Sequence, residues 1–456
     1  MDVELLARIQ FAFTIAFHYL YPPLSIGLGV LLVAMEGLYL RTGNKVYERM
    51  TRFWVKIFAL TFAMGVATGI VMEFEFGTNW AVYSRYVGDV FGSALAAEGI
   101  FAFFLESGFL AVLVFGWDRV SPRMHFFSTC MVSLGSMMSA VWIVVANSWM
   151  QTPAGFRIAG EGMSARAEIT DFWAMVFNPS SMERLAHTLS GAWLAGATLV
   201  LSVSAYYLLK RRHTDIALRS MKIATVLLVF ASLFQLFTGH RSAVGVSRNQ
   251  PAKMAAFEAH YDSSAPAPFY LFGWVNEEEQ RVNVGIAVPG MLSLLIHGDR
   301  TAPVTGLNAF PPDERPPVNV VFQFYHLMVA SGMALIALGF LFAFLWARGR
   351  LADQRWALRL GVASVLLPQI ANQAGWFAAE IGRQPWIVYG LLRTSDALSR
   401  TVTKEHIVFS LVLFGVIYAL LFALFLFLLD QKIKHGPDEP EGIASEYEHQ
   451  KQLLHG

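Results

Sequence analysis

The sequence has little charge and a single cysteine. Asp, Glu, Lys and Arg make up only 15% of the 456 residues, whereas 55% are hydrophobic, a composition unlike that of ordinary soluble domains. The formal net charge is +1, and there is no basic patch of the kind that nucleic acid requires. Cys130 stands alone, so an intrachain disulfide is excluded. These absences favour an integral membrane protein.

Long apolar runs account for most of the chain. A helix needs ~20 apolar residues to cross a hydrocarbon layer of ~30 Å, and the runs do not alternate with period two as strands of a membrane barrel do. The sequence therefore predicts an all-α integral membrane protein, with about nine transmembrane helices forming a single membrane domain over residues 1–456. The predicted spans are about 9–33, 53–74, 95–116, 125–149, 185–209, 220–240, 320–346, 357–379 and 404–429.

The positions of the basic residues predict how the chain is oriented. Lys and Arg accumulate in cytoplasmic loops, and here they are dense after the first, fifth and seventh spans, which share one face. The N-terminus is therefore expected outside and the tail, residues 430–456, in the cytoplasm. No small-residue cleavage pattern follows the start, so the first segment is expected to remain as a span.

The longest interruption, residues 241–318, follows the sixth span and is expected on the outside. Loops of this length are usually functional or disordered. Lys253 and Glu258 lie five residues apart on a short predicted helix. The alternative is a flexible linker with little regular core, in which the two side chains are a solvated pair.

Several polar side chains lie inside the predicted spans, mostly in their outer halves, and no histidine of the spans is expected deep in an inner half. For any one histidine, a hydrogen-bonded packing role is the commoner explanation, but ionisable residues within membranes are costly enough to indicate function. Imidazole, thioether and carboxylate groups are haem-iron ligands, so together these residues indicate a multi-haem site. No CxxCH motif is present, so any haem is bound non-covalently. The set comprises His18, about 14 Å into the first span, with His187, His240, His326, Met328, Glu380, His406, Glu73, Glu75 and Glu98.

Glu98 and Glu106 lie on one predicted span. Eight residues separate them by about 12 Å along the axis and about 80° around it. They either contribute to one proton pathway or serve as neutral, hydrogen-bonded carboxyls that fix the helix.

Polar residues within spans also fit two other classes. A transporter uses them for an ion or substrate pathway, although matched Gly/Pro-broken spans in two halves are not visible here. A haem-bearing membrane anchor would only pass electrons to another subunit.

Four stretches together identify a family resemblance. The chain resembles subunit I of the cytochrome bd-type quinol oxidases over essentially its whole length, and its outer loop resembles the shorter of the family's loop types. Whether it resembles the cyanide-insensitive branch stays open. The stretches are MEFEFGTNW (72–80), VANSWMQTPAGF (145–156), HTLSGAW (187–193) and GWFAAEIGRQPW (375–386).

The resemblance implies a respiratory oxidase of the bacterial inner membrane that oxidises ubiquinol or menaquinol and reduces dioxygen to water without pumping protons. It also implies a second membrane subunit and often a very small, single-span third one. Three haems are implied: a low-spin haem b bound by His187 and Met328, and a pair of high-spin haems, one of them haem b and the other haem d or a further haem b. His18 and Glu380 match axial ligands of that pair.

Other positions match the family's proton and quinol sites. Glu98 and Glu106 correspond to carboxylates on the proton route and beside the oxygen-reducing haems, and protons are expected to arrive from the cytoplasm past Glu106 and Ser139. Lys253 and Glu258 correspond to residues of the quinol-oxidising loop.

The residues around Glu380 explain how a carboxylate is kept in an apolar segment. Ferric iron would offset its desolvation cost, and Arg383 pairs either with a haem propionate or with the carboxylate itself. Trp376, one turn earlier, either stacks beside a haem or anchors the helix at the interface. Pro385 is expected to stop the helix.

Two positions depart from the family pattern. His326 stands where the pattern has arginine. Either the propionate pairing around the low-spin haem is changed, or His326 competes as a haem ligand. His240 stands where some relatives have an acid, which alters that end of the quinol site.

Overall fold

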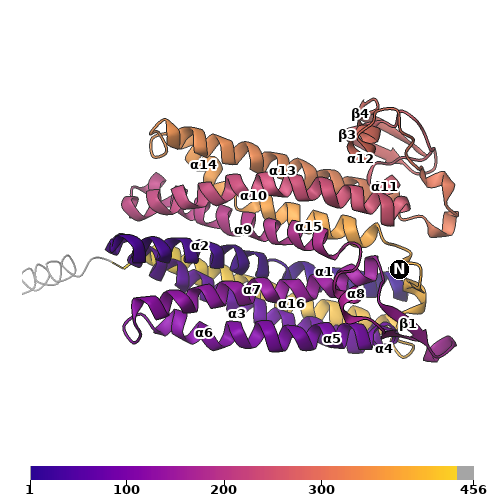
Figure 1. Cartoon of the computed structure of the whole chain (residues 1–456), viewed down its shortest axis with the longest axis horizontal. Coiled ribbons are helices and arrows are strands. Elements are labelled where there is room, and N and C mark those ends of the chain that lie inside the picture. The colour runs from indigo at the N-terminus through magenta and orange to yellow at the C-terminus, as the bar shows by residue number, and fades with distance from the viewer. Residues whose placement is uncertain (1, 439–456) are drawn as a thin grey trace, which may run out of the picture.

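Eight helical segments within residues 2–438, the part of the chain that the computed structural model describes, are long and apolar enough to cross a membrane (Figure 1). They coincide with eight of the nine predicted spans. The segments are α1 (Val3–His18) together with α2 (Pro22–Thr42), α3 (Lys45–Thr78), α5 (Gly88–Glu98) together with α6 (Phe104–Phe115), α7 (Pro122–Gln151), α9 (Ser181–Lys210), α10 (Thr214–Asn249), the stretch Pro312–Ala347, which contains α13 (Val318–Ala347), and α16 (Lys404–His435).

The first predicted span is not one continuous helix. α1 ends at His18, a turn follows over residues 19–21, and α2 begins at Pro22. A proline has no N–H for the preceding turn and disfavours helical geometry in the residue before it. The break therefore leaves His18 as the last residue of its helix rather than in the middle of a span.

The eighth predicted span, 357–379, consists of two shorter helices, α14 (Arg355–Ala363) and α15 (Leu366–Ile381). Pro368 cannot donate to the carbonyl four residues before it, which places the interruption at Ser364 and Val365. α15 ends at Ile381, so the expectation that Pro385 stops the helix is wrong by one turn.

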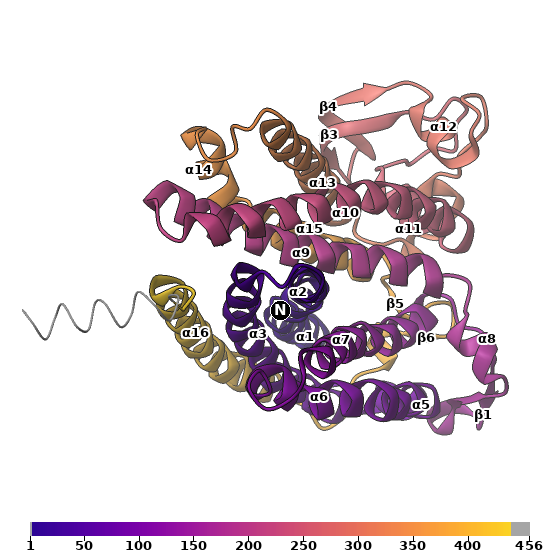
Figure 2. The ribbon, with the colours of Figure 1, turned by 60° about the vertical axis from the view of Figure 1, so that its left-hand side comes forward.

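α9 lies at the centre of the bundle, against α2, α7, α10 and α14 (Figure 2). Two glycines, Gly27 of α2 and Gly196 of α9, face each other where these helices meet. A Cβ at Gly27 would lie 2.6 Å from Gly196 N and 2.4 Å from Ala192 O. Small residues let membrane helices approach in this way, so this contact fixes the separation of α2 and α9.

A π-helical turn, Gly99–Phe103, joins α5 to α6. It lies between Glu98 and Glu106. Because a π-turn holds more residues than an α-turn, it changes the direction in which the two carboxylates face.

One end of the bundle carries the N-terminus and the segment between α10 and α13 (Figure 1). We call it the outer end, after the predicted orientation, and the opposite end the inner end. The elements not yet named are α4 (Ala81–Tyr86), α8 (Phe172–Val176), α11 (Pro251–Phe257), α12 (Met291–His297), and the antiparallel pairs β1 (Phe156–Ala159) with β2 (Arg166–Ile169), β3 (Phe269–Asn276) with β4 (Arg281–Val288), and β5 (Trp386–Val388) with β6 (Leu392–Arg393).

The segment between α10 and α13 is folded, which contradicts the flexible-linker alternative. α10 continues to Asn249, and α11, β3, β4 and α12 follow. Residues of α11, β3 and α12 share an apolar core with the start of α13, including Met254, Phe257 and Phe322. The loop therefore has a regular core of its own.

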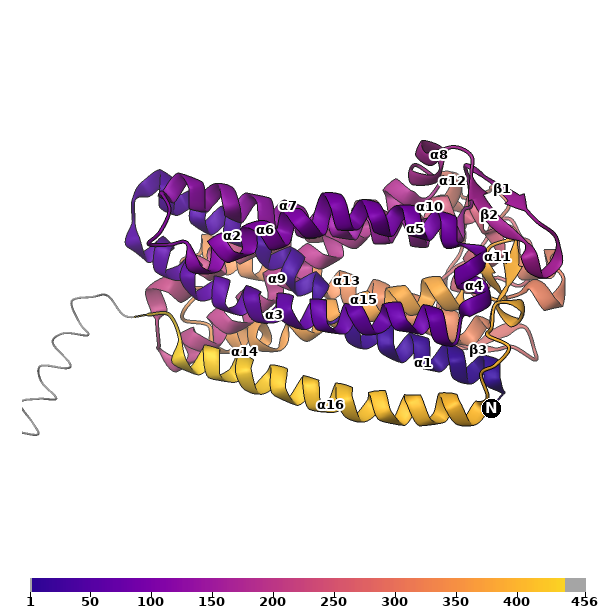
Figure 3. The same ribbon diagram turned by 90° about the horizontal axis from the view of Figure 1, so that it is seen from below.

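α16 runs along the side of the bundle against α1 and α3 (Figure 3). It continues to His435, so the first residues of the predicted tail, 430–456, are helical. Residues 439–456 lie outside the described part of the chain. Cys130 is a free, half-buried cysteine of α7.

Candidate functional site

Glu380, in the last turn of α15, is held by side chains from α7 and from the turn that follows α15. Asn147 Nδ2 and Gln151 Nε2 of α7 donate to its Oε1 over 3.2 and 3.1 Å. Arg383 Nη2 donates to Oε2 over 2.5 Å. Of the two expectations for Arg383, pairing with the carboxylate itself is the one observed.

Arg184 of α9 completes this cluster on the other side of Asn147. Its Nη2 donates to Asn147 Oδ1, and its guanidinium lies 5.6 Å from the centre of the Trp376 ring. The indole also meets Tyr19 edge-on, with ring centres 5.6 Å apart. Trp376 therefore packs among the residues around Glu380.

Lys253 connects the outer loop to the same cluster. It is only 2% exposed, and its Nζ donates to Gln151 Oε1 over 2.5 Å. Gln250 supports this contact by donating to the Gln151 carbonyl over 3.0 Å. Burial, reinforced by the positive charge of Arg184, lowers the pKa of Lys253 well below its ordinary value. A single glutamine thus separates Lys253 from Glu380.

Glu258 follows directly after α11 and is 1% exposed. Neither carboxyl oxygen has a hydrogen-bond partner among the described residues. Burial raises the pKa of Glu258 to about 8, so the group is largely protonated at neutral pH. The alternative of a solvated pair with Lys253 is wrong, because both side chains are buried.

His187 and Met328 each face a glycine. His187 Nδ1 contacts Thr238 Oγ1 at 3.1 Å, and a Cβ at Gly239 would lie 3.2 Å from the imidazole. A Cβ at Gly375 would lie 2.8 Å from Met328 Sδ. Side chains larger than glycine would displace both groups.

The second imidazole nitrogen of His187 meets Gln235. The two Nε2 atoms are 3.0 Å apart, and Ser190 donates to the other end of the same amide. Ligation of iron through this nitrogen requires the Gln235 side chain to turn away.

His18 ends α1 against α3. Its Nδ1 lies 2.9 Å from Thr68 Oγ1, and a Cβ at Gly69 would lie 3.3 Å from the ring. The threonine fixes one nitrogen and leaves Nε2 available for a ligand. This is the arrangement that an axial histidine needs, because the second nitrogen sets the ring's orientation.

These residues fit haem better than a bare metal ion. No three His, Cys, Asp or Glu side chains within residues 2–438 gather as a metal site, but haem supplies four nitrogens of its own and needs only one or two protein ligands. Arg184 Nε and Arg383 Nε and Nη1 are buried with no partner among the described residues. Such guanidinium atoms suit the carboxylates of haem propionates.

Glu98 and Glu106 both face α7. Ser139, expected on the route with Glu106, donates instead to Glu98 over 2.7 Å, and Ser136 donates to Glu106. The predicted offset of about 80° is wrong, because the π-turn between them removes about one residue of rotation and leaves about 20°. The two carboxylates therefore lie along one face, against serines three residues apart.

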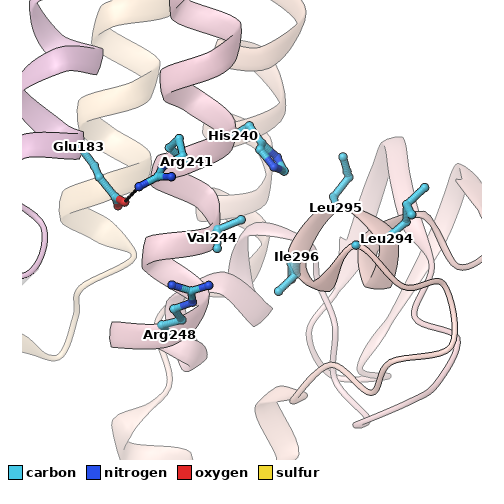
Figure 4. Close-up of a pocket in the computed structure, with 9 residues that line it drawn as sticks. Glu183, His240, Arg241, Val244, Arg248, Leu294, Leu295 and Ile296 are labelled. Atoms are coloured by element: carbon cyan, nitrogen blue, oxygen red, sulfur yellow. Dashed lines mark ion pairs between the residues drawn. The ribbon is translucent and has the colours of Figure 1, made fainter.

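The two departures from the family pattern have different surroundings. His326 is buried, with its nitrogens 2.9 and 2.8 Å from the carbonyl oxygens of Phe322 and Tyr270. Both nitrogens are engaged, which argues against His326 as a competing iron ligand. His240 lies on the exposed side of α10, in a pocket beside α12 (Figure 4).

The sequence reasoning missed a buried pair near the inner end. His125 Nδ1 lies 2.6 Å from Glu36 Oε1, and Thr129 donates to Glu36 Oε2 over 2.5 Å. A histidine therefore does occupy an inner half, contrary to the expectation, although its neighbours satisfy it completely.

Asn147, Gln151 and Arg184 were also missed as members of the Glu380 cluster. Asn147 and Gln151 are one helical turn apart within the VANSWMQTPAGF stretch. That i, i+4 spacing was the available signal.

Comparisons with known proteins agree with this arrangement. The family model described as cytochrome bd terminal oxidase subunit I matches residues 6–437. Cytochrome bd ubiquinol oxidase subunit 1 of Bacillus subtilis (strain 168) is 40% identical over 450 residues, which are 96% of this chain and 95% of that protein. Cytochrome bd-II ubiquinol oxidase subunit 1 of Escherichia coli (strain K12) is 35% identical over 96% of this chain and 97% of its own length.

The fold is similar to a solved structure. The bd oxidase from Geobacillus thermodenitrificans has a chain that superposes with a TM-score of 0.89 and 30% identity, covering 96% of this chain and 99% of that one. The multi-pass helical architecture and the family resemblance are thereby confirmed. The chain belongs to the cytochrome bd terminal oxidase subunit I family.

Proposed function

We propose that this chain is the haem-bearing subunit of a quinol oxidase that oxidises ubiquinol or menaquinol at the outer end and reduces dioxygen to water. The observation that carries the proposal is the connection from the loop to the bundle, in which Lys253 donates to Gln151 and Gln151 donates to Glu380. It puts a buried loop residue within two hydrogen bonds of the candidate haem ligand. A transporter has no need of such a connection.

Three haems are proposed, one low-spin haem b and a high-spin pair of which one is haem b and the other haem d or haem b. His187 and Met328 would hold the low-spin haem, and His18 and Glu380 would be axial ligands of the pair. Bound haem supplies electron transfer and the reduction of dioxygen. Arg184 and Arg383 would hold the propionates through their unpartnered guanidinium atoms.

Quinol oxidation is assigned to Lys253 and Glu258. Glu258 has no internal partner to compete for its carboxyl, so it would accept a proton from a bound quinol hydroxyl. Lys253 would orient the quinol oxygen from the side of Gln151.

Glu98, Glu106 and Ser139 are assigned to proton uptake from the inner end. Ser136 and Ser139 hold the two carboxylates along one face of α7, which supports a single route. Taking up protons on one side and releasing the quinol's protons on the other separates charge without a pump.

The orientation follows from the basic loops, with the N-terminus outside, residues 241–318 as the extracytoplasmic quinol loop and the tail in the cytoplasm of a bacterium. A second membrane subunit, and a small single-span one, are proposed as partners. The names of the relatives, which specify subunit 1 of ubiquinol and menaquinol oxidases, support this.

Reduced-minus-oxidised and carbon monoxide difference spectra of the purified complex test the proposal. Low-spin and carbon monoxide-binding high-spin signals are expected together. His187→Ala or Met328→Ala should remove or convert the low-spin signal, and Glu380→Ala should perturb the high-spin signal and abolish oxygen reduction.

Two spectral outcomes would count against the proposal. A folded complex without haem absorbance would favour a transporter. Purely low-spin haem without carbon monoxide binding would favour an electron-transferring anchor.

A further inference from the structure

A cavity of about 290 Å³ opens between the outer end of α10 and helix α12 (Figure 4). Lys253 and Glu258 do not line it. His240, Arg241 and Arg248 of α10 line it, together with Leu294, Leu295 and Ile296 of α12. It therefore combines cationic and apolar walls.

The cavity has an excess of positive charge. Arg241 Nη2 lies 3.6 Å from Glu183 Oε1, so one carboxylate offsets one guanidinium. No described residue forms an ion pair with Arg248, which is exposed. A ligand with a phosphate or another anionic group would complete this charge arrangement.

The register of α10 distinguishes a lipid from a soluble anion. Phe230, Leu233 and Phe237 are 57%, 44% and 60% exposed, although α10 is long and apolar enough to cross a membrane. Arg241 follows Phe237 by four residues and Arg248 follows seven later, so all five side chains lie on one helix face. An apolar strip thus runs along the span and ends at two arginines. This order matches a phospholipid, whose acyl chains are apolar and whose headgroup carries a phosphate.

The neighbouring hairpin has an apolar face of the same kind. Phe272 pairs with Ile286 and Trp274 with Val284, each of them at least 53% exposed. The intervening Gly273 has its opposite face against α13, so these four side chains point away from that helix. β3, β4 and α12 lie together at the outer end of the bundle, beside the end of α10 (Figures 1 and 2).

We propose that this cavity binds the phosphate headgroup of an anionic phospholipid, with its acyl chains along the apolar strip of α10 and the β3–β4 hairpin resting on the same leaflet. Arg241 and Arg248 bind the phosphate. Leu294, Leu295 and Ile296 cover its glycerol side. The lipid thereby ties the quinol loop to the bilayer surface.

Lipid binding to the purified, delipidated oxidase complex tests this directly. Native mass spectrometry should find one tightly bound phosphatidylglycerol and no equivalent phosphatidylcholine. In the Arg241→Gln/Arg248→Gln double variant the affinity for phosphatidylglycerol should fall at least about tenfold. Arg281→Gln, an exposed hairpin arginine that pairs with Glu279, should leave it unchanged.

The proposal would be overturned by equal phosphatidylglycerol affinity in the double variant, by equal binding of phosphatidylcholine, or by displacement of the lipid by a quinol analogue. Inorganic phosphate separates the two possible anion sources. If it competes at the same concentration as phosphatidylglycerol, the site takes a free anion and the lipid assignment is wrong. Haem spectra identical to those of the wild type verify that the variants are folded, and the readout does not depend on turnover.

Discussion

Two buried carboxyl groups at opposite ends of the molecule have opposite surroundings. Glu36, near the inner end, is 1% exposed and has partners on both oxygens, His125 and Thr129. Glu258, at the outer end, is also 1% exposed and has none. Buried polar groups are normally satisfied, so the first carboxyl is explained by the fold alone, whereas the second requires a ligand. Burial by itself does not distinguish structure from function, but the hydrogen-bond partners do.

Removing Glu36 should have the largest effect. Glu36→Ala leaves His125 and Thr129 without their buried partner, and breaking such a pair costs about 3–5 kcal/mol. The expected result is a strong loss of folded complex and a lowered Tm in detergent. An unchanged Tm would mean that the inner pair is not structural.

Glu258→Gln should have the opposite result, a loss of activity without a loss of stability. No internal hydrogen bond is lost, and a buried carboxyl with a raised pKa is replaced by a neutral amide, so Tm should not fall and haem content should stay at the wild-type value. Quinol oxidation should fall about 100-fold, as expected for loss of a general base. Steady-state quinol kinetics and thermal unfolding on the same preparation measure both quantities. Wild-type kinetics would reject the role of Glu258, and a lowered Tm would remove its contrast with Glu36.

Packing density differs between α2, which packs closely against α9, and α16, at the side of the bundle. Gly27 has no room for a Cβ, because Ala192 and Gly196 of α9 lie against it. Gly27→Ala should destabilise the bundle by about 1–3 kcal/mol through overpacking, seen as a lower Tm. Gly415→Ala is the matched control, since nothing lies within 4 Å of a Cβ there, and equal Tm values for the two variants would contradict the close contact.

The pH dependence of quinol oxidation should show the smallest effect. Glu258 accepts a proton only when ionised, and burial raises its pKa to about 8. The ionised fraction rises from about 10% at pH 7 to about 50% at pH 8, so the rate should rise about fivefold over that interval. The Glu258→Gln variant should not show this rise. A wild-type rate that is flat from pH 7 to pH 8 would contradict the role of Glu258 as proton acceptor.

The same raised pKa has a consequence for stability. The folded chain holds this proton more tightly than the unfolded chain, so the contribution of Glu258 is complete below pH 4.5 and is lost as pH rises through about 8.

The spans could be predicted because membrane crossing depends mainly on the length of apolar runs. The breaks within two of the predicted spans were harder to predict. The break after His18 is set by Pro22, and the break at Ser364 by Pro368, both visible in the sequence but hidden by the surrounding apolar residues. The fold of the outer loop depends on contacts between residues far apart, such as Phe257 and Phe322, and composition alone suggested a linker.

The candidate site was predicted in its ligands but not in its connections. The family resemblance pointed to Lys253 and Glu380 individually, whereas Gln151 between them was marked only by its place in the VANSWMQTPAGF stretch, one turn after Asn147. Arg184 carried no signal in the sequence, and only the tertiary structure brings it onto Asn147. Side-chain networks between helices depend on their relative rotation, which hydrophobic periodicity does not specify.

The π-turn at Gly99–Phe103 sets the direction of everything that follows it in this segment. Deleting one residue there would leave Glu98 and Glu106 seven positions apart in a regular α-helix, an offset of about 20° that keeps both carboxylates on one face. Regular α-helical geometry without a deletion would instead rotate everything from Phe104 onward by about 100° relative to α5. Glu106 would then turn away from Ser136 while Glu98 kept Ser139, so the backbone alone, with no change in any acidic or hydroxyl side chain, would uncouple the two carboxylates.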